Sequence, residues 1–217
     1  RSRNTTSLTL EDADDISAMP SVRLVVPRQR KRMRVIYKKN STVTRVYGAT
    51  PEWQVARSWQ LSDGVFFAED DMKRKRRVVV LGATPAEKLF ADTDPIGKSV
   101  RIGTVFFEVI GLLEKKGLTE SGYDPDDRTI IPLMTSMSRL TNQTYLHSIK
   151  VMAMSPGQTR GTMEGVRQVL RKNHNLSTIN RTISSNNSIG ENPIFFHSKI
   201  ARPVLDEHIK LRKTFLI

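Results

Sequence analysis

The chain has 217 residues, of which 35 are lysine or arginine and 22 are aspartate or glutamate, so its formal net charge is +13. Its length suits one large domain or two small ones, and the absence of cysteine excludes disulfides and thiol chemistry. No segment reaches the roughly 18 consecutive apolar residues of a membrane-spanning helix, so no such helix is predicted.

The N-terminal part of the chain is predicted to fold as a helix, a strand and a hairpin. Thr9 and Asp12 have the spacing of a capping box for a helix that ends near Met19. The apolar alternation at 22–26 predicts a strand that Pro27 ends. A hairpin is expected next, with strands at 33–37 and 43–47 and a turn at 38–41.

A short helix near Pro51–Arg57 comes next, and two tryptophans accompany it. The main interpretation of Trp53 and Trp59 is core packing. The alternative is a contact surface for a partner, because tryptophan is favoured at interface hot spots. Trp53, Arg57 and Trp59 are therefore the candidate partner contacts of this sequence.

The segment Gly48–Leu113 alternates buried-type strands with well-marked turns. The apolar run Arg77–Leu81, ended by Gly82, predicts a strand. Thr84 is expected to cap the following helix, with Glu87 completing a capping box. Further elements are predicted at Asp63-Gly64 (turn), Glu69–Asp71 (helix start), Asp94–Gly97 (type I turn) and 100–113 (a hairpin turning at Gly103-Thr104). The residues expected to serve structural turns are Gly48, Gly64, Gly82, Pro95 and Gly97.

After the central block the pattern loosens into a polar loop at 114–128. The next elements expected are a strand at 129–133, a short helix to about Leu140, a strand at 145–152 and an amphipathic helix at 159–174. Residues 179–217 begin with a segment rich in serine and asparagine, and they are predicted to be an atypical tail, looped or disordered.

The residues that attract a chemical interpretation do not form a catalytic, cofactor or metal site. Gly97-Lys98-Ser99 resembles the end of a phosphate-binding loop, but Asp92 stands where that loop needs its first glycine. The histidines lack metal-ligand spacing, and no G-x-S-x-G elbow is present. Asp124-Pro125-Asp126-Asp127 offers at most a weak cation site. We therefore predict a chain without enzymatic activity or cofactor.

The positive charge is concentrated in two stretches. Residues 16–51 contain no acidic side chain, and Lys73–Arg77 is an uninterrupted basic run. Such stretches suit an acidic partner, an anionic membrane surface or nucleic acid. Nucleic acid is the weakest of the three, because no binding motif accompanies the charge and aromatic residues make up only 6% of the chain.

Several motifs occur together in the order found in one known family. They include G-A-T-P-E-W from Gly48, W-Q-L-S-D-G-V-F-F from Trp59, V-V-V-L-G-A-T from Val78, D-P-I-G-K from Asp94 and F-E-V-I-G-L-L from Phe107. Over about residues 8 to 178 the chain resembles the periplasmic core domain of MacB-type ABC transporter permeases. The resemblance implies an α+β fold of two small α/β subdomains. A discontinuous porter-like subdomain, 1–47 plus 130–178, would carry a second subdomain, 48–129, inserted in it.

The resemblance also implies a function and a location. Domains of this family are periplasmic parts of bacterial inner-membrane proteins, lying next to the membrane. They transmit movement driven by ATP hydrolysis in a separate nucleotide-binding domain, within a homodimeric transporter. The expected partners are a periplasmic adaptor protein and an outer-membrane channel, with drugs, peptides or toxins as cargo. A lipoprotein- or lipid-handling permease without an adaptor is the alternative within transport.

Overall fold

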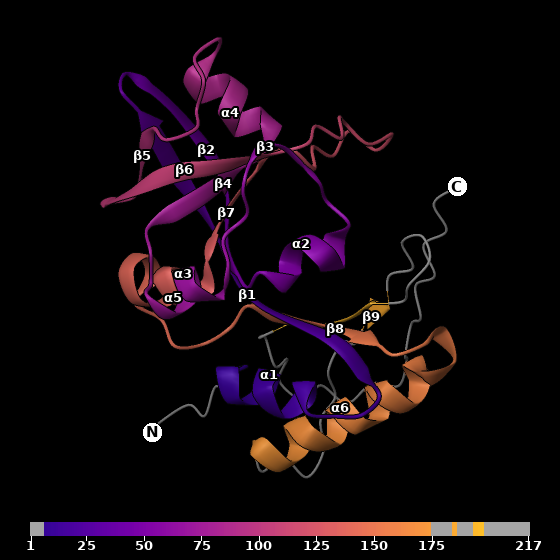
Figure 1. The fold of residues 1–217 in the computed structure, drawn as a ribbon. Helices are drawn as coiled ribbons and strands as arrows, with labels where there is room; N and C mark the ends of the chain where they lie inside the picture. The colour runs from indigo at the N-terminus through magenta and orange to yellow at the C-terminus, as the bar shows by residue number, and fades with distance from the viewer. Residues whose placement is uncertain (1–6, 175–183, 186–192, 198–217) are drawn as a thin grey trace, which may run out of the picture. The chain divides into compact units, whose positions relative to one another are not determined.

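The computed structural model describes residues 7–174, 184–185 and 193–197 (Figure 1). The chain divides into two compact units, one made of Arg1–Pro27 with Tyr145–Ile217 and the other of Arg28–Thr144. Both contain helices and strands, which confirms the predicted α+β class. Among the described helices, none has the length and apolar character needed to span a bilayer.

The first unit packs two helices beside a sheet. Its elements are α1 (Leu10–Ser17), the start of β1 (Val22–Tyr37), β8 (Ser148–Ala153), a 3₁₀ turn (Pro156–Gln158), α6 (Thr159–Asn173), β9 (Ser184–Ser185) and β10 (Pro193–His197). β8 lies between β1 and β10 in the sheet order. Figure 1 shows α1 and α6 next to each other, and the two helices are in contact. Ile16, Ile149, Val151, Val166 and Leu170 are fully or almost fully buried and form the centre of this unit.

The capping box predicted for the first helix is confirmed. The backbone N–H of Asp12 donates to Thr9 Oγ1 at 3.2 Å, and the backbone N–H of Thr9 donates to Asp12 Oδ2 at 2.9 Å. These two bonds satisfy orphan donors at the helix start. The helix at the far end of the unit, α6, also lies where its periodicity predicts, with Val166 and Leu170 on its buried side.

The second unit is built on strands that close into a ring. Its strands are β1, β2 (Asn40–Ala49), β3 (Leu61–Gly64), β4 (Val78–Leu81), β5 (Ser99–Ile102), β6 (Val105–Leu113) and β7 (Arg128–Pro132). The order β2-β7-β4-β6-β5-β1 is completed by pairing of β1 with β2, and β3 pairs with β6. Each ring strand contributes to one core: Val35, Val46, Val79, Leu81, Val100, Ile102, Phe107, Val109 and Ile131.

Short helices complete the second unit. They are α2 (Glu52–Arg57), α3 (Glu69–Lys73), α4 (Ala83–Phe90) and α5 (Leu133–Thr135), the last continuing as a π-helical turn (Ser136–Thr141). α4 packs on β2 and adds Leu89 and Phe90 to the core (Figure 1). The hairpins at β1–β2 and β5–β6 match the sequence prediction, with Tyr37 opposite Asn40 and Ile102 opposite Val105.

The boundaries between the units differ from those predicted at residues 48 and 129. Residues 28–47 were assigned to the porter-like part, yet they form the β1–β2 hairpin of the ring. Residues 130–132 likewise lie in β7, which pairs with both β2 and β4. Removing either segment would open the ring and expose its core, so both belong with Arg28–Thr144. Of the predicted tail 179–217, only the strands β9 and β10 lie among the described residues.

Pro27 does not end a strand, contrary to the prediction. β1 continues through it to Tyr37, and pairing with β2 begins at the next residue, Arg28. Proline lacks the backbone N–H that donates in a β-ladder. It is tolerated here because Pro27 lies where β1 changes its neighbouring strand.

Two predicted turn glycines lie inside strands. Gly48 is buried in β2, where a Cβ atom would come within 2.4 Å of Ser136 Cβ. Gly64 ends β3 with φ +74°, next to a register shift in the β3–β6 pairing. Gly48 is therefore required for close approach of Ser136, and Gly64 for a backbone conformation that side chains disfavour.

The start of α4 also differs from the prediction. Gly82 is the N-cap, and no side chain caps the helix. The Thr84 hydroxyl instead donates to Asp124 Oδ2 at 2.7 Å, and Glu87 accepts from Lys115 Nζ at 2.7 Å. Both side chains of the expected capping box therefore bind residues that are distant in the chain.

The Asp94–Gly97 turn is displaced by one residue. The Lys98 N–H donates to the Pro95 carbonyl at 3.1 Å, so the turn spans Pro95 to Lys98. Gly97 occupies its third position with φ +74°. Asp94 accepts from the Ile96 N–H at 2.9 Å and fixes the entry to the turn.

Replacing Gly111 with alanine is expected to destabilise the second unit by roughly 1–3 kcal/mol, because a new Cβ would lie 2.4 Å from the Val65 carbonyl oxygen. Urea unfolding followed by tryptophan fluorescence measures this, since both tryptophans of the chain lie in this unit. Gly161→Ala is the contrasting substitution in α6. Its Cβ would meet nothing within 4 Å, and circular dichroism should show no loss of stability. Equal stability of Gly111→Ala and the parent chain would contradict the steric argument.

Candidate functional site

The predicted contact residues come together around α2. Trp53 and Arg57 are four residues apart on this helix and share one of its faces. The helix ends at Ser58, whose left-handed φ of 46° reverses the chain. Trp59 is thereby brought back onto Trp53, with ring centroids 6.0 Å apart and planes inclined by 23°.

Both tryptophan rings are buried. Trp53 is 2% exposed and Trp59 is 4% exposed. The Trp59 Nε1–H donates to the Glu114 carbonyl at 2.8 Å, and the Phe66 ring stacks on Trp53 with a centroid distance of 6.0 Å. Burial of this kind fits the core-packing interpretation of both tryptophans. Arg57 is only partly buried, so it is the member of the predicted set that solvent reaches.

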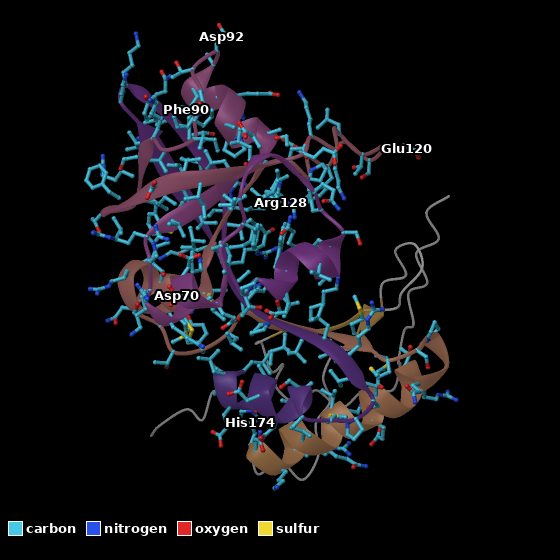
Figure 2. All side chains as sticks on the ribbon, viewed as in Figure 1. Asp70, Phe90, Asp92, Glu120, Arg128 and His174 are labelled. Carbon is cyan, nitrogen blue, oxygen red and sulfur yellow. The ribbon has the colours of Figure 1, made fainter. Side chains whose placement is uncertain are left out.

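Cationic side chains lie over these rings. The Arg128 guanidinium is 4.3 Å from the centroid of Trp59 and 5.8 Å from those of Trp53 and Tyr47 (Figure 2 labels Arg128). Arg28 lies 5.5 Å from the Tyr47 centroid. The six residues Arg28, Tyr47, Trp53, Arg57, Trp59 and Arg128 are called the arginine–aromatic cluster below.

Burial and mutual repulsion shape the electrostatics of the cluster. Burial, with repulsion from Arg57, lowers the pKa of Arg28 to about 10. Burial also lowers the pKa of Arg57 and that of Arg128 from their usual values. Guanidinium groups stay charged at neutral pH, so the cluster concentrates positive charge where solvation is weak.

Sequence reasoning found half of this cluster. Trp53, Arg57 and Trp59 were identified from their clustering around one short helix. Arg28 and Arg128 were missed, because they come from β1 and β7 and are about one hundred residues apart in the chain. Among sequence features, only the long basic stretch containing Arg28 indicated charge in this region.

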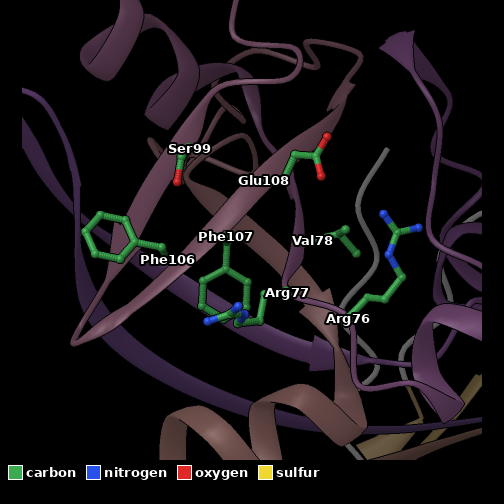
Figure 3. A pocket seen from close by; sticks show the side chains of 7 residues that line it. All are labelled: Arg76, Arg77, Val78, Ser99, Phe106, Phe107 and Glu108. Carbon is green, nitrogen blue, oxygen red and sulfur yellow. The ribbon is translucent and has the colours of Figure 1, made fainter.

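A second feature of this unit is an open groove beside β6 (Figure 3). Its volume is about 340 Å³, and it is lined by Arg76, Arg77, Val78, Ser99, Phe106, Phe107 and Glu108. Alternation along β6 turns Phe107 into the core, while Phe106 is 58% exposed. Arg76 pairs with Asp71 at 2.9 Å. The groove exposes an aromatic ring, Phe106, beside basic side chains.

The residues considered for metal or nucleotide chemistry have structural partners. In the described part of the chain, no group of three or more His, Asp or Glu residues is placed to hold a metal ion. Gly97-Lys98-Ser99 passes from a turn into β5, not into a helix. In the Asp124–Asp127 loop, the Asp124 carboxylate accepts from the backbone N–H of Asp126 at 2.8 Å.

Comparisons with known proteins point to one family. The sequence model described as "MacB-like periplasmic core domain" matches residues 1–169. The macrolide export ATP-binding/permease protein MacB of Azoarcus sp. (strain BH72) is 35% identical over 179 residues, covering 81% of this chain and 27% of that protein. The pyoverdine export ATP-binding/permease protein PvdT of Pseudomonas putida (strain KT2440) is 30% identical, covering 77% of this chain and 26% of that protein. The chain thus spans about a quarter of the length of these curated relatives.

Solved structures share the fold. The extracellular domain of the noncanonic ABC-type transporter YknZ from Gram-positive bacteria aligns with a TM-score of 0.71 at 24% identity, covering 80% of this chain and 87% of that one. The periplasmic region of MacB from Actinobacillus actinomycetemcomitans aligns with a TM-score of 0.70 at 23% identity, covering 81% and 78%.

Proposed function

Since the chain belongs to the MacB-like periplasmic core domain family, we propose that it is the periplasmic domain of a MacB-like ABC transporter permease and passes on movement driven by ATP. In this proposal ATP is hydrolysed by a separate nucleotide-binding domain, and the chain itself is not catalytic. The observation that carries the proposal is the family match over residues 1–169.

The division into two compact units supports a mechanical role. Each unit has its own buried core, so each can move as a rigid body when the chain segments joining them flex. β1 is one of those joining segments, because it starts in the first unit and continues into the second. The proposal keeps the predicted arrangement of one discontinuous subdomain and one inserted subdomain. The inserted subdomain now spans Arg28–Thr144.

The proposed partners are a periplasmic adaptor protein and an outer-membrane channel, with the full-length transporter acting as a homodimer in the inner membrane. The groove beside β6, with exposed Phe106 and basic Arg77, supports docking of an acidic surface. A contact role for Trp53, Arg57 and Trp59 also stays a proposal. Trp53 and Trp59 would act there indirectly, because both rings are buried.

The movement is testable by spin labelling in the full-length transporter, because this chain contributes no cysteine to the background. Labels at Lys88→Cys on α4 and Arg160→Cys on α6 report on different units, and both native side chains are exposed. ATP binding is expected to shift the distance distribution between the labels, measured by double electron–electron resonance.

A label pair within one unit is the control. Glu69→Cys on α3 and Lys88→Cys both lie in the second unit, so their distance should stay constant through the ATP cycle. If the Lys88–Arg160 distance also stays constant while the transporter hydrolyses ATP, the mechanical proposal fails.

A further inference from the structure

Two arginines of the arginine–aromatic cluster, Arg57 and Arg128, carry positive charge that no carboxylate of the described residues pairs with. Among the residues that the structure describes, no acidic side chain lies within ion-pair distance of Arg57 or Arg128. Arg128 Nε donates to the Pro125 carbonyl, which orients the guanidinium without neutralising it. Arg57 donates to no acceptor in the described part of the chain. Arg128 is therefore held near aromatic rings, and both guanidinium groups have hydrogen-bonding capacity left over.

The carboxylates of the adjacent loop are already engaged. Asp127 pairs with Arg45 at 3.3 Å. Asp126 accepts from the backbone N–H groups of Lys116 and Gly117 at 2.8 to 3.1 Å. Asp124 accepts from the Thr84 hydroxyl at 2.7 Å. Turning any of them toward Arg57 or Arg128 would break bonds that shape the loop, so the carboxylates of this loop do not serve as counter-ions.

The Trp53 indole is another donor of the cluster to consider. Trp53 Nε1 is buried, and no described residue accepts its hydrogen bond. A buried donor without a partner costs about 1–3 kcal/mol, so such groups commonly mark a ligand or a functional constraint. Burial holds the pKa of Arg57 below its usual value, which means that folding disfavours its charged form. An anion beside Arg57 would relieve the second cost, because it would stabilise the charged guanidinium.

We propose that Arg57 and Arg128 form a binding site for a phosphate-type oxyanion. The planar guanidinium fork donates two parallel hydrogen bonds to such an oxyanion, which a lysine ammonium does not. The Trp59 ring centroid lies 4.3 Å from the Arg128 guanidinium, and this cation–π contact stabilises the position of the guanidinium. Partial exposure of Arg57 leaves an approach from solvent. Inorganic phosphate and the headgroup of an anionic phospholipid present the same chemistry, and the test separates them.

The test uses the 217-residue chain with two probes. Isothermal titration calorimetry measures inorganic phosphate, and co-sedimentation measures phosphatidylcholine vesicles with or without phosphatidylglycerol. We expect saturable binding to at least one anionic probe, weakened about tenfold or more by Arg57→Gln, which corresponds to roughly 1.4 kcal/mol. Arg139→Gln is the matched control, because it removes the same charge from an exposed position in the same unit, outside both the cluster and the groove beside β6.

Each outcome decides the proposal. Loss of phosphate binding in Arg57→Gln but not in Arg139→Gln supports a site for free phosphate, and the same pattern with vesicles alone supports a headgroup site. Equal weakening by both variants, unchanged binding in Arg57→Gln, or no saturable binding to either probe overturns it. Arg57→Lys should restore only part of the affinity, because it keeps the charge and loses the fork.

Thermal unfolding separates a ligand role from a structural one. Without phosphate, Arg57→Gln should leave the melting temperature unchanged or raise it, since it removes a poorly solvated charge. A structural arginine would lower the melting temperature on removal. Arg128→Gln is a secondary test, because its side chain is only 5% exposed and the variant risks poor folding.

Discussion

Replacing Trp53 with alanine is expected to lower the free energy of unfolding of the second unit by about 3–5 kcal/mol. The ring is 2% exposed and lies between two others, Trp59 and Phe66, each with its centroid 6.0 Å away. Truncation removes apolar contact on both faces and leaves a cavity that the short helix α2 is poorly able to close. Urea unfolding followed by the fluorescence of the remaining Trp59 measures the change.

Two variants of the same helix sharpen this test. Trp53→Phe keeps an aromatic ring between Trp59 and Phe66 and removes the N–H that lacks an acceptor, so its cost should be well below that of alanine. Val55→Ala changes a side chain that is 68% exposed and should alter stability by no more than about 0.5 kcal/mol. A Trp53→Ala protein as stable as Val55→Ala would show that the ring is not part of the core.

Features set by neighbouring residues could be predicted from the sequence. The Thr9–Asp12 capping box depends on residues three apart, and the hairpin at Tyr37–Asn40 depends on two strands joined by a short turn. The helix at the end of the first unit followed from its apolar periodicity. In these elements local energetics and the fold agree, so reasoning over a few residues was sufficient.

The closed ring could not be predicted, because its closure depends on long-range pairing. β2 pairs in parallel with β7, with Arg45 opposite Arg128, and β1 pairs with β5 through Val35 and Ile102. Nothing in the local pattern of any of these strands specifies its neighbour. The predicted unit boundaries differ from the division at Arg28 and Thr144 for this reason, since the division depends on which strands complete the ring.

In the candidate site, too, residues close together in the chain could be predicted and residues brought in by distant strands could not. Trp53, Arg57 and Trp59 lie within seven residues, so their association was visible in the sequence. Thr84 shows how tertiary contacts override a local signal, because Asp124 takes the hydroxyl expected to cap α4. Arg128 enters the site through β7, and only the fold brings it over the tryptophan rings.

The junction of α1 with α6 depends on one buried carboxylate. Asp12 is fully buried, and His174 Nε2 lies 2.9 Å from its Oδ1 and 2.8 Å from its Oδ2 (Figure 2 labels His174). Asn173 Nδ2 donates to Asp12 Oδ1 at 3.1 Å, and the backbone N–H of Thr9 donates to Oδ2. The Asp12 side chain therefore takes part in the cap of α1 and also accepts hydrogen bonds from the end of α6, about 160 residues further along the chain.

Replacing Asp12 with alanine is accordingly expected to cost the first unit about 3–5 kcal/mol, because it deprives the Thr9 N–H and the His174 ring nitrogen of this buried partner and removes one half of the capping box. Urea unfolding followed by circular dichroism measures the loss, and hydrogen exchange should show the end of α6 opening first. Asp14→Ala is the matched control, since it removes the same charge from an exposed position of α1. Similar losses in the two variants would mean that net charge, and not the buried network, sets the stability of this junction.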